Sequence, residues 1–143
     1  MPTTLESRRF GSLPVADEEI LRFPEGLPGF EELREFLLLS PPDLAPVQFL
    51  VSLQVPEIIF PILPASLCLG KYAPTIDAAD CHDLGAADGS AFAIYAILTF
   101  HHEREEVTAN LRAPVLINPL ARLGRQVTLV DSTYSLRHPL LGG

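Results

Sequence analysis

Two short segments of the sequence contain adjacent side chains of the kinds that bind metal ions. Residues 101–103 read His-His-Glu, and residues 81–83 read Cys-His-Asp. Adjacent residues of a strand or turn point in opposite directions, so neither run by itself can converge on one ion. The sequence also lacks the H-E-x-x-H and paired C-x-x-C patterns of zinc sites. We therefore expect polar turn residues at both runs, with neither a metal nor any other cofactor.

The three residue types of a hydrolytic triad occur close together near the C-terminus, as Asp131, Ser132 and His138. A nucleophilic serine needs a strained turn that exposes its hydroxyl, such as the G-x-S-x-G elbow, and no such pattern surrounds Ser132. Any chain of this size supplies these residue types by chance, so the set does not indicate a hydrolase.

Two glycine-containing segments each share one feature with phosphate-binding loops. Gly70 and Lys71 lack the preceding glycine and the following Ser or Thr of a P-loop. Residues 26–29 match the G-x-x-G of KH domains, but the middle is Leu-Pro and the flanks are acidic.

With no catalytic constellation, the sequence favours a binding protein that is not an enzyme and has no small-molecule substrate. The alternative is a small β-barrel enzyme or ligand carrier, which would need a deep polar pocket.

The composition is typical of one globular domain. Of the 143 residues, 48% are hydrophobic and 20% are charged, which is enough apolar material for a core and too little charge for a disordered chain. We expect a single domain over residues 1–143, with frayed ends at about residues 1–3 and 141–143.

Neither a membrane segment nor a secretory signal is predicted. The longest apolar run, residues 91–100, is about half as long as a membrane-spanning helix. No apolar stretch follows Arg8 and Arg9 near the N-terminus. Cys68 and Cys81 form no C-x-x-C pair, which suits a reducing compartment. We therefore expect a cytoplasmic protein.

The negative charge is concentrated in the first three quarters of the chain. Residues 1–109 carry seventeen acidic and six basic side chains, a net charge of −11, whereas the whole chain has −8. Such a surface repels phosphate backbones, so direct nucleic-acid binding of the cold-shock kind is not expected. It attracts basic surfaces instead, including those of proteins that themselves bind RNA. The alternative is that the acidic residues only keep the protein soluble.

The hydrophobic pattern predicts an all-β fold, mainly antiparallel, as a barrel or sandwich of about seven to nine short strands with one or two short helices. The clearest strands are 46–53, which alternates with a period of two, and 91–100, which is apolar on both faces and hence central. Pro61 removes a ladder donor, so the strand over 58–63 is expected at an edge or bulge. The remaining strands are expected at 4–10, 19–23, 72–76, 107–118 and 126–130. One turn of helix is expected just before the strand that ends at residue 39, and a second short helix is expected over 77–84, before Gly85. A hairpin tip is expected over 101–105. The tail, residues 134–143, is expected to fray.

A segment rich in proline and glycine, residues 23–30, cannot form a helix or a central strand. Each proline fixes φ and lacks an N–H, and each glycine can adopt positive φ. A phenylalanine stands at each end, so we expect a rigid corner with both rings in the core rather than a surface loop. The residues expected to build this corner are Phe23, Pro24, Gly26, Pro28, Gly29 and Phe30.

Four blocks, in order along the chain, resemble the FliW family of flagellar assembly factors. The first block is residues 20–31, which includes the corner, and the second is residues 49–61. The third is residues 108–118, and Gly-Arg-Gln-Val at 124–127 with Arg-His-Pro-Leu at 137–140 completes the set. Each block alone is weak evidence, but four in register over most of the chain are specific.

The resemblance implies a cytoplasmic bacterial protein with a β-barrel-like fold and two protein partners. One partner is the translational regulator CsrA, which represses flagellin messenger RNA. The other is flagellin, bound through its C-terminal region. Accumulating flagellin would occupy the protein and free CsrA to repress, and exported flagellin would return the protein to CsrA.

The partner surfaces are hypotheses drawn from charge and pattern. CsrA must be basic to hold RNA, so we expect clustered acidic residues to face it. A flagellin terminus that is disordered before assembly could fold into an apolar groove or onto a sheet edge, for which the strand with Pro61 is a candidate. The corner is expected to be scaffold, as are Asn110, Pro114 and Asn118. The acidic residues proposed to face CsrA are Asp77, Asp80, Asp83, Glu103, Glu105 and Glu106.

Overall fold

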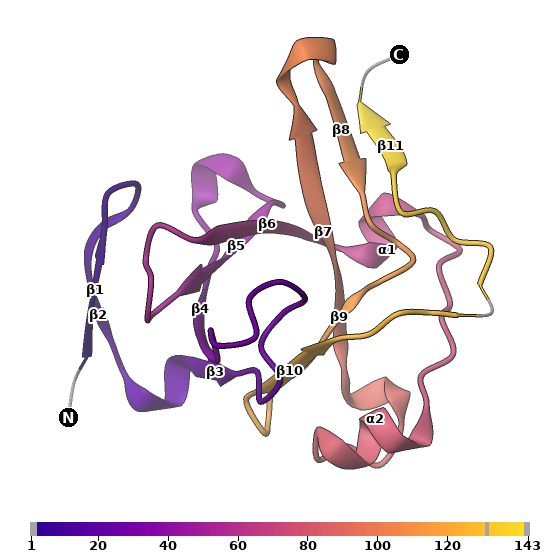
Figure 1. The fold of residues 1–143 in the computed structure, drawn as a ribbon, viewed down its shortest axis with the longest axis horizontal. Helices are drawn as coiled ribbons and strands as arrows, with labels where there is room; N and C mark the ends of the chain where they lie inside the picture. The colour runs from indigo at the N-terminus through magenta and orange to yellow at the C-terminus, as the bar shows by residue number, and fades with distance from the viewer. Residues whose placement is uncertain (1–2, 131, 142–143) are drawn as a thin grey trace.

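Seven strands close into a barrel in the computed structural model of the chain, which describes residues 3–130 and 132–141 (Figure 1). Around the ring the order is β7-β6-β5-β4-β3-β10-β9, and β9 pairs back onto β7. Neighbours are antiparallel except β3 and β10, which pair in parallel at Arg22 and Leu123. The predicted mainly antiparallel β-barrel is confirmed. The ring strands are β3 Ile20–Arg22, β4 Glu35–Leu39, β5 Gln48–Ser52, β6 Ile59–Pro64, β7 Ala93–His101, β9 Val115–Asn118 and β10 Leu123–Gln126.

The remaining elements lie outside the ring. β8 (Glu106–Ala109) pairs with the far half of β7, and β11 (His138–Leu141) pairs with β8. We call this three-stranded projection, which rises above the barrel in Figure 1, the arm. The N-terminal hairpin joins β1 (Thr3–Ser7) to β2 (Gly11–Val15). The described residues also form two short α-helices, α1 (Ala65–Cys68) and α2 (Ala78–Asp83). In the described residues no helix has the length and apolarity needed to cross a membrane.

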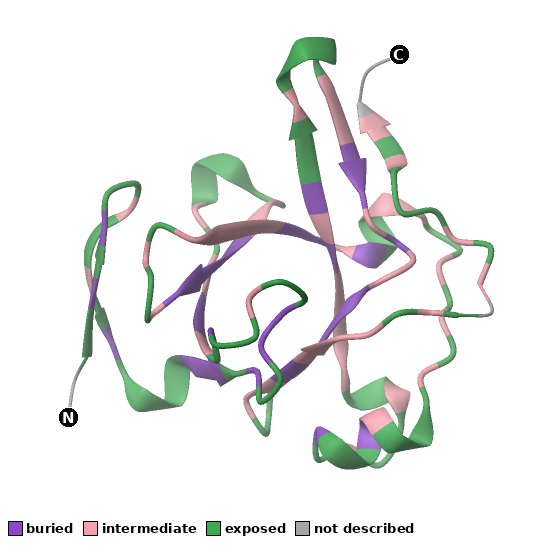
Figure 2. Cartoon of the chain, viewed as in Figure 1, coloured by how far each residue is buried: buried purple, intermediate pink, exposed green. Residues whose placement is uncertain are grey.

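The interior of the ring is filled with side chains. Inward-facing residues of the ring strands pack there against Phe23, Leu27 and Leu33 from the loop that follows β3. The rings of Phe23 and Phe36 are fully buried and meet edge to face, with centroids 5.1 Å apart. Figure 2 shows buried residues along the ring strands and exposed residues on the arm tip and on much of α2. The barrel is therefore a packed core and not a ligand cavity.

Two further clusters attach the outer elements to the barrel. Leu5 and Val15 of the hairpin pack on the outer face of the sheet, against Phe49 and Val51 of β5. Leu50 of β5 faces the interior instead, so the predicted alternation over 46–53 is confirmed, with both faces buried. A third cluster lies between the arm and α1 and includes Leu63, Ala65, Ala96, Leu98, Ala109 and Leu111.

Pro61 does not place its strand at an edge, and that prediction is wrong. β6 pairs with β5 over residues 59–62 and with β7 over residues 62–64. The Ser52 N–H donates to Ile58 O, so by the alternation of the ladder the nitrogen of Pro61 faces the β7 side. The pairing of β6 with β7 ends at Ile62 and Ile97, so β7 has already left β6 at the level of Pro61. The missing N–H of Pro61 therefore removes no ladder bond.

Side-chain hydrogen bonds explain where the predicted strands break. The single strand expected over 107–118 is divided into β8 and β9, because Asn110 Oδ1 accepts hydrogen bonds from Arg112 N and Ala113 N and bends the chain. The strand expected over 72–76 is absent. Tyr72 Oη donates to Leu111 O at 2.7 Å and Ala73 N donates to Tyr134 Oη, so side chains hold this segment in place of a ladder.

Three smaller predictions are also corrected. The helical turn expected before β4 is absent, because Gln54 Oε1 accepts from Arg34 N and Glu35 N and holds that stretch as an irregular turn. The strand expected over 126–130 is replaced by β10, which ends at Gln126. Gly11, at φ +81°, turns the chain, so the expected first strand is a hairpin.

Ordered pairing extends nearly to both ends of the described chain. Thr3 pairs with Val15, and residues 138–141 pair with β8, where the tail was expected to fray. The other residues expected to fray at the ends, 1–2 and 142–143, lie outside the described residues. The helix predicted before Gly85 is confirmed as α2, and the tip predicted over 101–105 is confirmed at the end of the β7–β8 hairpin.

Candidate protein-interaction site

Arg125 of β10 ties helix α2 to the barrel. Its Nη1 donates to Asp80 Oδ1 at 2.8 Å and to Asp83 Oδ2 at 3.1 Å. Its Nε lies 3.1 Å from Glu25 Oε1 in the corner, an ion-pair distance without the alignment of a hydrogen bond. One guanidinium, with a side chain only 13% exposed, therefore joins the corner, β10 and α2.

The α2 end of the molecule remains acidic after this pairing. Burial lowers the pKa of the Arg125 guanidinium, but the hydrogen bonds from Asp80 and Asp83 and the charge of Glu25 raise it by more, so its pKa lies above the ordinary value. The single positive charge faces three carboxylates. Asp77, at the start of α2, is exposed and forms no ion pair within the described residues.

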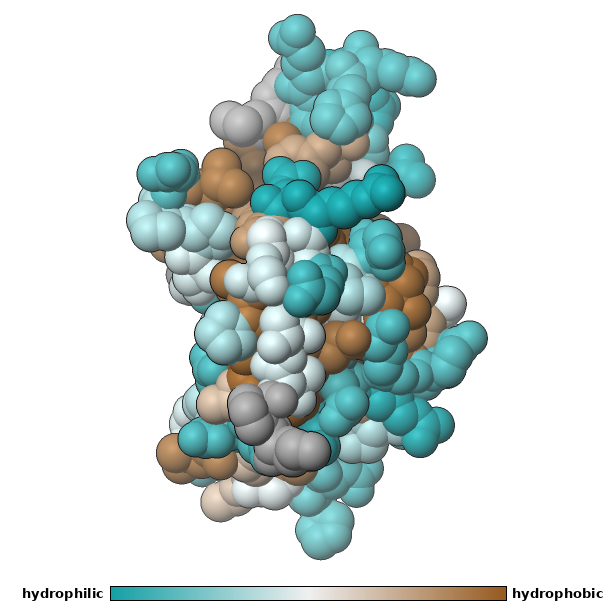
Figure 3. Space-filling view, turned by 90° about the vertical axis from the view of Figure 1, so that its left-hand side faces the viewer, coloured by the Kyte–Doolittle hydropathy of each residue, from teal (hydrophilic) through white to brown (hydrophobic). Residues whose placement is uncertain are grey.

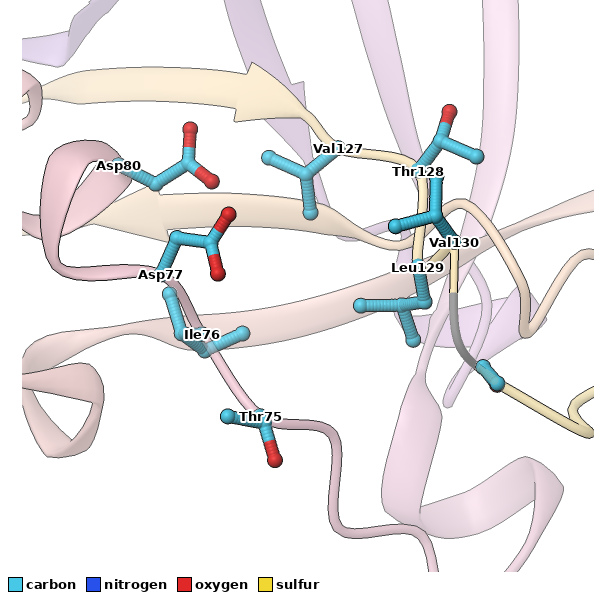
Figure 4. Close-up of a pocket in the computed structure, with 9 residues that line it drawn as sticks. Thr75, Ile76, Asp77, Asp80, Val127, Thr128, Leu129 and Val130 are labelled. Atoms are coloured by element: carbon cyan, nitrogen blue, oxygen red, sulfur yellow. The ribbon is translucent and has the colours of Figure 1, made fainter.

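A cleft of about 350 Å³ opens beside Asp77 and Asp80 (Figure 4). One wall is the extended segment 75–77 that leads into α2, and the other is segment 127–130 after β10. The carboxylates of Asp77 and Asp80 lie toward one end, and Leu129 and Val130 lie toward the other. Such a cleft suits a protein segment that carries both basic and apolar side chains.

The three glutamates of the predicted acidic surface lie elsewhere. Glu103 and Glu105 are exposed at the tip of the arm, and Glu106 begins β8 and pairs with Arg104 at 3.2 Å. In Figure 1 this tip and α2 stand at opposite ends of the view. The structure thus brings Asp77, Asp80 and Asp83 together and separates them from the glutamates.

The corner packs its two phenylalanine rings against the barrel and leaves its prolines at the surface. Phe23 is fully buried, and Phe30 is half-buried with its ring centroid 5.3 Å from that of Phe60. Gly26 and Gly29 adopt φ of +64° and +86°, where residues with a side chain are strained. Both proline rings of the corner, Pro24 and Pro28, are exposed.

The two predicted asparagines organise turns that support α2 and the arm. Asn118 is buried; its Nδ2 donates to Leu84 O at 2.8 Å, just after α2, and its Oδ1 accepts from Leu120 N and Ala121 N. Asn110 forms the bend described above, and Pro114 is buried between that bend and β9. These contacts are internal.

The residue runs tested for catalysis and metal binding do not converge in the described part of the chain. No three His, Cys, Asp or Glu side chains there group as metal ligands. Cys81 is buried and His82 is exposed. Ser132 Oγ accepts a hydrogen bond from Tyr134 N, and Asp131 lies outside the described residues.

Sequence reasoning missed Arg125 and Gly124. Arg125 is 42 and 45 residues from its two hydrogen-bonded partners, so no local spacing signals the contact. The available signals were the family block at 124–127, which contains both residues, and a basic residue in an acidic chain.

Comparison with known proteins now identifies the family. The family model described as "FliW protein" matches residues 4–140, nearly the whole chain. The chain belongs to the FliW family. It is 35% identical over 133 residues to the flagellar assembly factor FliW of Thermotoga sp. strain RQ2, covering 92% of this chain and 89% of that one. The corresponding FliW of Bdellovibrio bacteriovorus is 35% identical over 136 residues, covering 95% and 78%.

The fold agrees with that of a solved FliW. A crystal structure of the flagellar assembly factor FliW superposes with a TM-score of 0.90 at 30% identity and covers 99% of both chains. The resemblance seen in the sequence blocks is therefore confirmed, and the barrel with its arm and hairpin is the FliW fold.

Proposed function

We propose that the chain is a cytoplasmic flagellar assembly factor that binds CsrA, antagonises its repression of flagellin messenger RNA, and binds the C-terminal region of flagellin as a chaperone-like partner. Residues 1–143 act as one domain that performs no chemistry and binds neither nucleic acid nor membrane. The observation that carries the proposal is the match to FliW over residues 4–140, together with relatives described as flagellar assembly factors.

The interior of the barrel supports a binding role over the alternative of a ligand carrier or enzyme. Phe23, Phe36 and Leu50 fill the space that a carrier would leave for its ligand. The cleft at α2 and the groove described below both lie on the outer surface and are lined by several elements, as expected of sites for other proteins.

We propose the α2 end as the surface that faces CsrA. Asp77 and Asp80 line the cleft of Figure 4 there, Asp83 ends the same helix, and net negative charge remains after pairing with Arg125. A protein that holds RNA presents a basic surface, and complementary potentials increase both association rate and specificity. Glu103, Glu105 and Glu106 lie on the arm, away from this cleft. Substitutions there therefore serve as a control for substitutions of the aspartates at α2.

Competition between the two partners tests the function. The purified chain, immobilised, is loaded with CsrA and challenged with flagellin, and then the order is reversed. We expect each partner to be retained and flagellin to release CsrA. Failure to retain either partner would refute the proposed function.

Matched charge reversals test the surface. Asp77→Lys should weaken CsrA binding by about tenfold and reduce its salt dependence, because an attractive charge becomes repulsive. The comparison is Glu103→Lys, which changes the net charge equally at the tip of the arm. If Glu103→Lys weakens binding and Asp77→Lys does not, the arm is the surface that faces CsrA.

A further inference from the structure

A groove of about 490 Å³ crosses the outside of the barrel between the hairpin and the arm. Its floor is the outer face of β5 and β6, its sides come from the segment before β5 and from the end of β7, and its rim carries two basic side chains. Figure 3, which views the hairpin side, shows apolar surface between the hairpin and the hydrophilic tip of the arm. The lining residues are Arg9, Leu44, Val47, Phe49, Ile59, Pro61, Phe100 and His102.

Large apolar side chains are exposed on both sides of this groove. Leu44 is 43% exposed on one side, and Phe100 is 44% exposed on the other. Val47, Ile59 and Pro61 between them are half-buried. Exposed apolar groups that line one concavity, unlike isolated exposed leucines, are typical of a protein-binding surface.

The charge of the groove differs from that of the rest of the chain. Among the described residues, Arg9 and His102 are the only ionisable ones that line the groove, and no acidic side chain of that part of the chain lines it. The Arg9 guanidinium lies 5.5 Å from the ring centroid of Phe49 and 5.9 Å from that of Phe10, which holds it over the groove. Within the described residues no carboxylate lies within ion-pair distance of Arg9. The groove is therefore suited to an apolar segment that carries acidic groups.

The backbone of the groove floor has no free hydrogen-bonding edge, which favours a helical ligand over an extended one. β5 is paired with β4 and β6 on its two sides, and Pro61 of β6 has no N–H to offer. An extended segment laid across this face would leave its own backbone groups unpaired against apolar side chains. A helix satisfies its backbone internally and can present leucine-type residues at i, i+3/i+4 and i+7 to the groove.

We infer that this groove binds an amphipathic, acidic helical segment from the C-terminal region of flagellin. The inference rests on the proposed function for its choice of partner. Of the two proposed partners, the RNA-binding one is basic and would be repelled by Arg9, whereas an acidic apolar helix matches both the rim and the floor. Flagellin and CsrA then occupy different faces of the chain, and flagellin releases CsrA through negative coupling between the two sites and not through overlap.

Titration of purified flagellin and, separately, CsrA into the whole chain tests this assignment. Leu44→Asp and Phe100→Ser should each weaken flagellin binding by about tenfold or more and leave CsrA binding unchanged. Leu120→Asp is the matched control, since Leu120 is 93% exposed on the turn after β9 and does not line the groove. Arg9→Glu should weaken flagellin binding, whereas Arg8→Glu, which changes the same charge on the neighbouring residue outside the groove, should not.

The outcomes separate the inference from the proposed function. If the wild-type chain binds neither partner, the proposed function fails. If it binds flagellin and the groove variants bind as tightly as the Leu120→Asp and Arg8→Glu controls, only the inference is overturned. Loss of CsrA binding instead of flagellin binding also overturns it. If an apolar variant fails to fold, the comparison of Arg9→Glu with Arg8→Glu still tests the inference. Both arginines are exposed, so neither substitution disturbs the core.

Discussion

Gly124 of β10 leaves the space that the ring of Phe23 occupies. A Cβ placed on Gly124 would lie 2.5 Å from Phe23 Cζ and 2.7 Å from its Cε1. Phe23 is completely buried and packs edge to face on Phe36, so its ring cannot move aside without disturbing the core. The contact joins the start of the corner to the strand that carries Arg125.

Gly124→Ala should therefore destabilise the fold. We expect a loss of about 2–3 kcal/mol in the free energy of unfolding, the size of an overpacked core. Gly70→Ala is the matched control, because Gly70 is exposed and a Cβ there meets nothing within 4 Å. Urea denaturation followed by circular dichroism measures both. Equal midpoints for the two variants would show that the core accommodates the extra methyl group.

The two glycines of the corner should differ in their tolerance of a side chain. Both have positive φ, but a Cβ on Gly26 would lie 2.5 Å from Phe30 O, whereas one on Gly29 meets nothing within 4 Å. Gly29→Ala should cost about 1 kcal/mol from backbone strain alone, and Gly26→Ala at least about 3 kcal/mol from strain and clash together. Thermal unfolding of the two variants gives the order. A reversed order would contradict this account of strain and clash. Loss of a partner from a fully stable Gly29→Ala protein would mean that the corner is a contact surface.

Arg125→Met should loosen α2. The variant keeps the apolar stem but leaves Asp80, Asp83 and Glu25 without their shared cation. We expect a loss of about 1–2 kcal/mol at low salt, discounted because the carboxylates are partly solvated, and a smaller loss at high salt. Arg104→Met is the control, since its pair with Glu106 lies at the exposed tip of the arm and should contribute less than about 0.5 kcal/mol. Hydrogen exchange of α2 amides should rise in Arg125→Met only.

Tyr72 should make stability fall at alkaline pH. Burial raises the pKa of the Tyr72 phenol, and the neighbouring Tyr134 and Cys68 raise it further. The folded state therefore favours the neutral phenol, which donates to Leu111 O. This contribution is fully present below the unfolded pKa of about 10 and is lost as pH rises above it toward the folded pKa. Tyr72→Phe should cost about 1 kcal/mol at pH 7, and its difference from wild type should shrink above about pH 10. A difference that stays constant across that range would contradict this account.

The sequence alone determined the class of fold, the clearest strands and the family. Period-two alternation over 46–53 and two-sided apolarity over 91–100 reflect local constraints that any sheet imposes, so they were readable without coordinates. The corner was readable for the same reason, because the φ preferences of proline and glycine act within a few residues. The four family blocks are likewise linear patterns.

Only the tertiary structure decided what depends on contacts between distant parts of the chain. Pro61 sits in a central strand because β7 diverges from β6 at that level, a fact of sheet topology. Arg125 collects Asp80, Asp83 and Glu25 from segments 42 or more residues away, and the six predicted acidic residues separate into two groups. The groove with Leu44, Phe100 and Arg9 also exists only in three dimensions. Local propensity acts over a few bonds, whereas packing and ion pairing depend on which segments the closed barrel brings together.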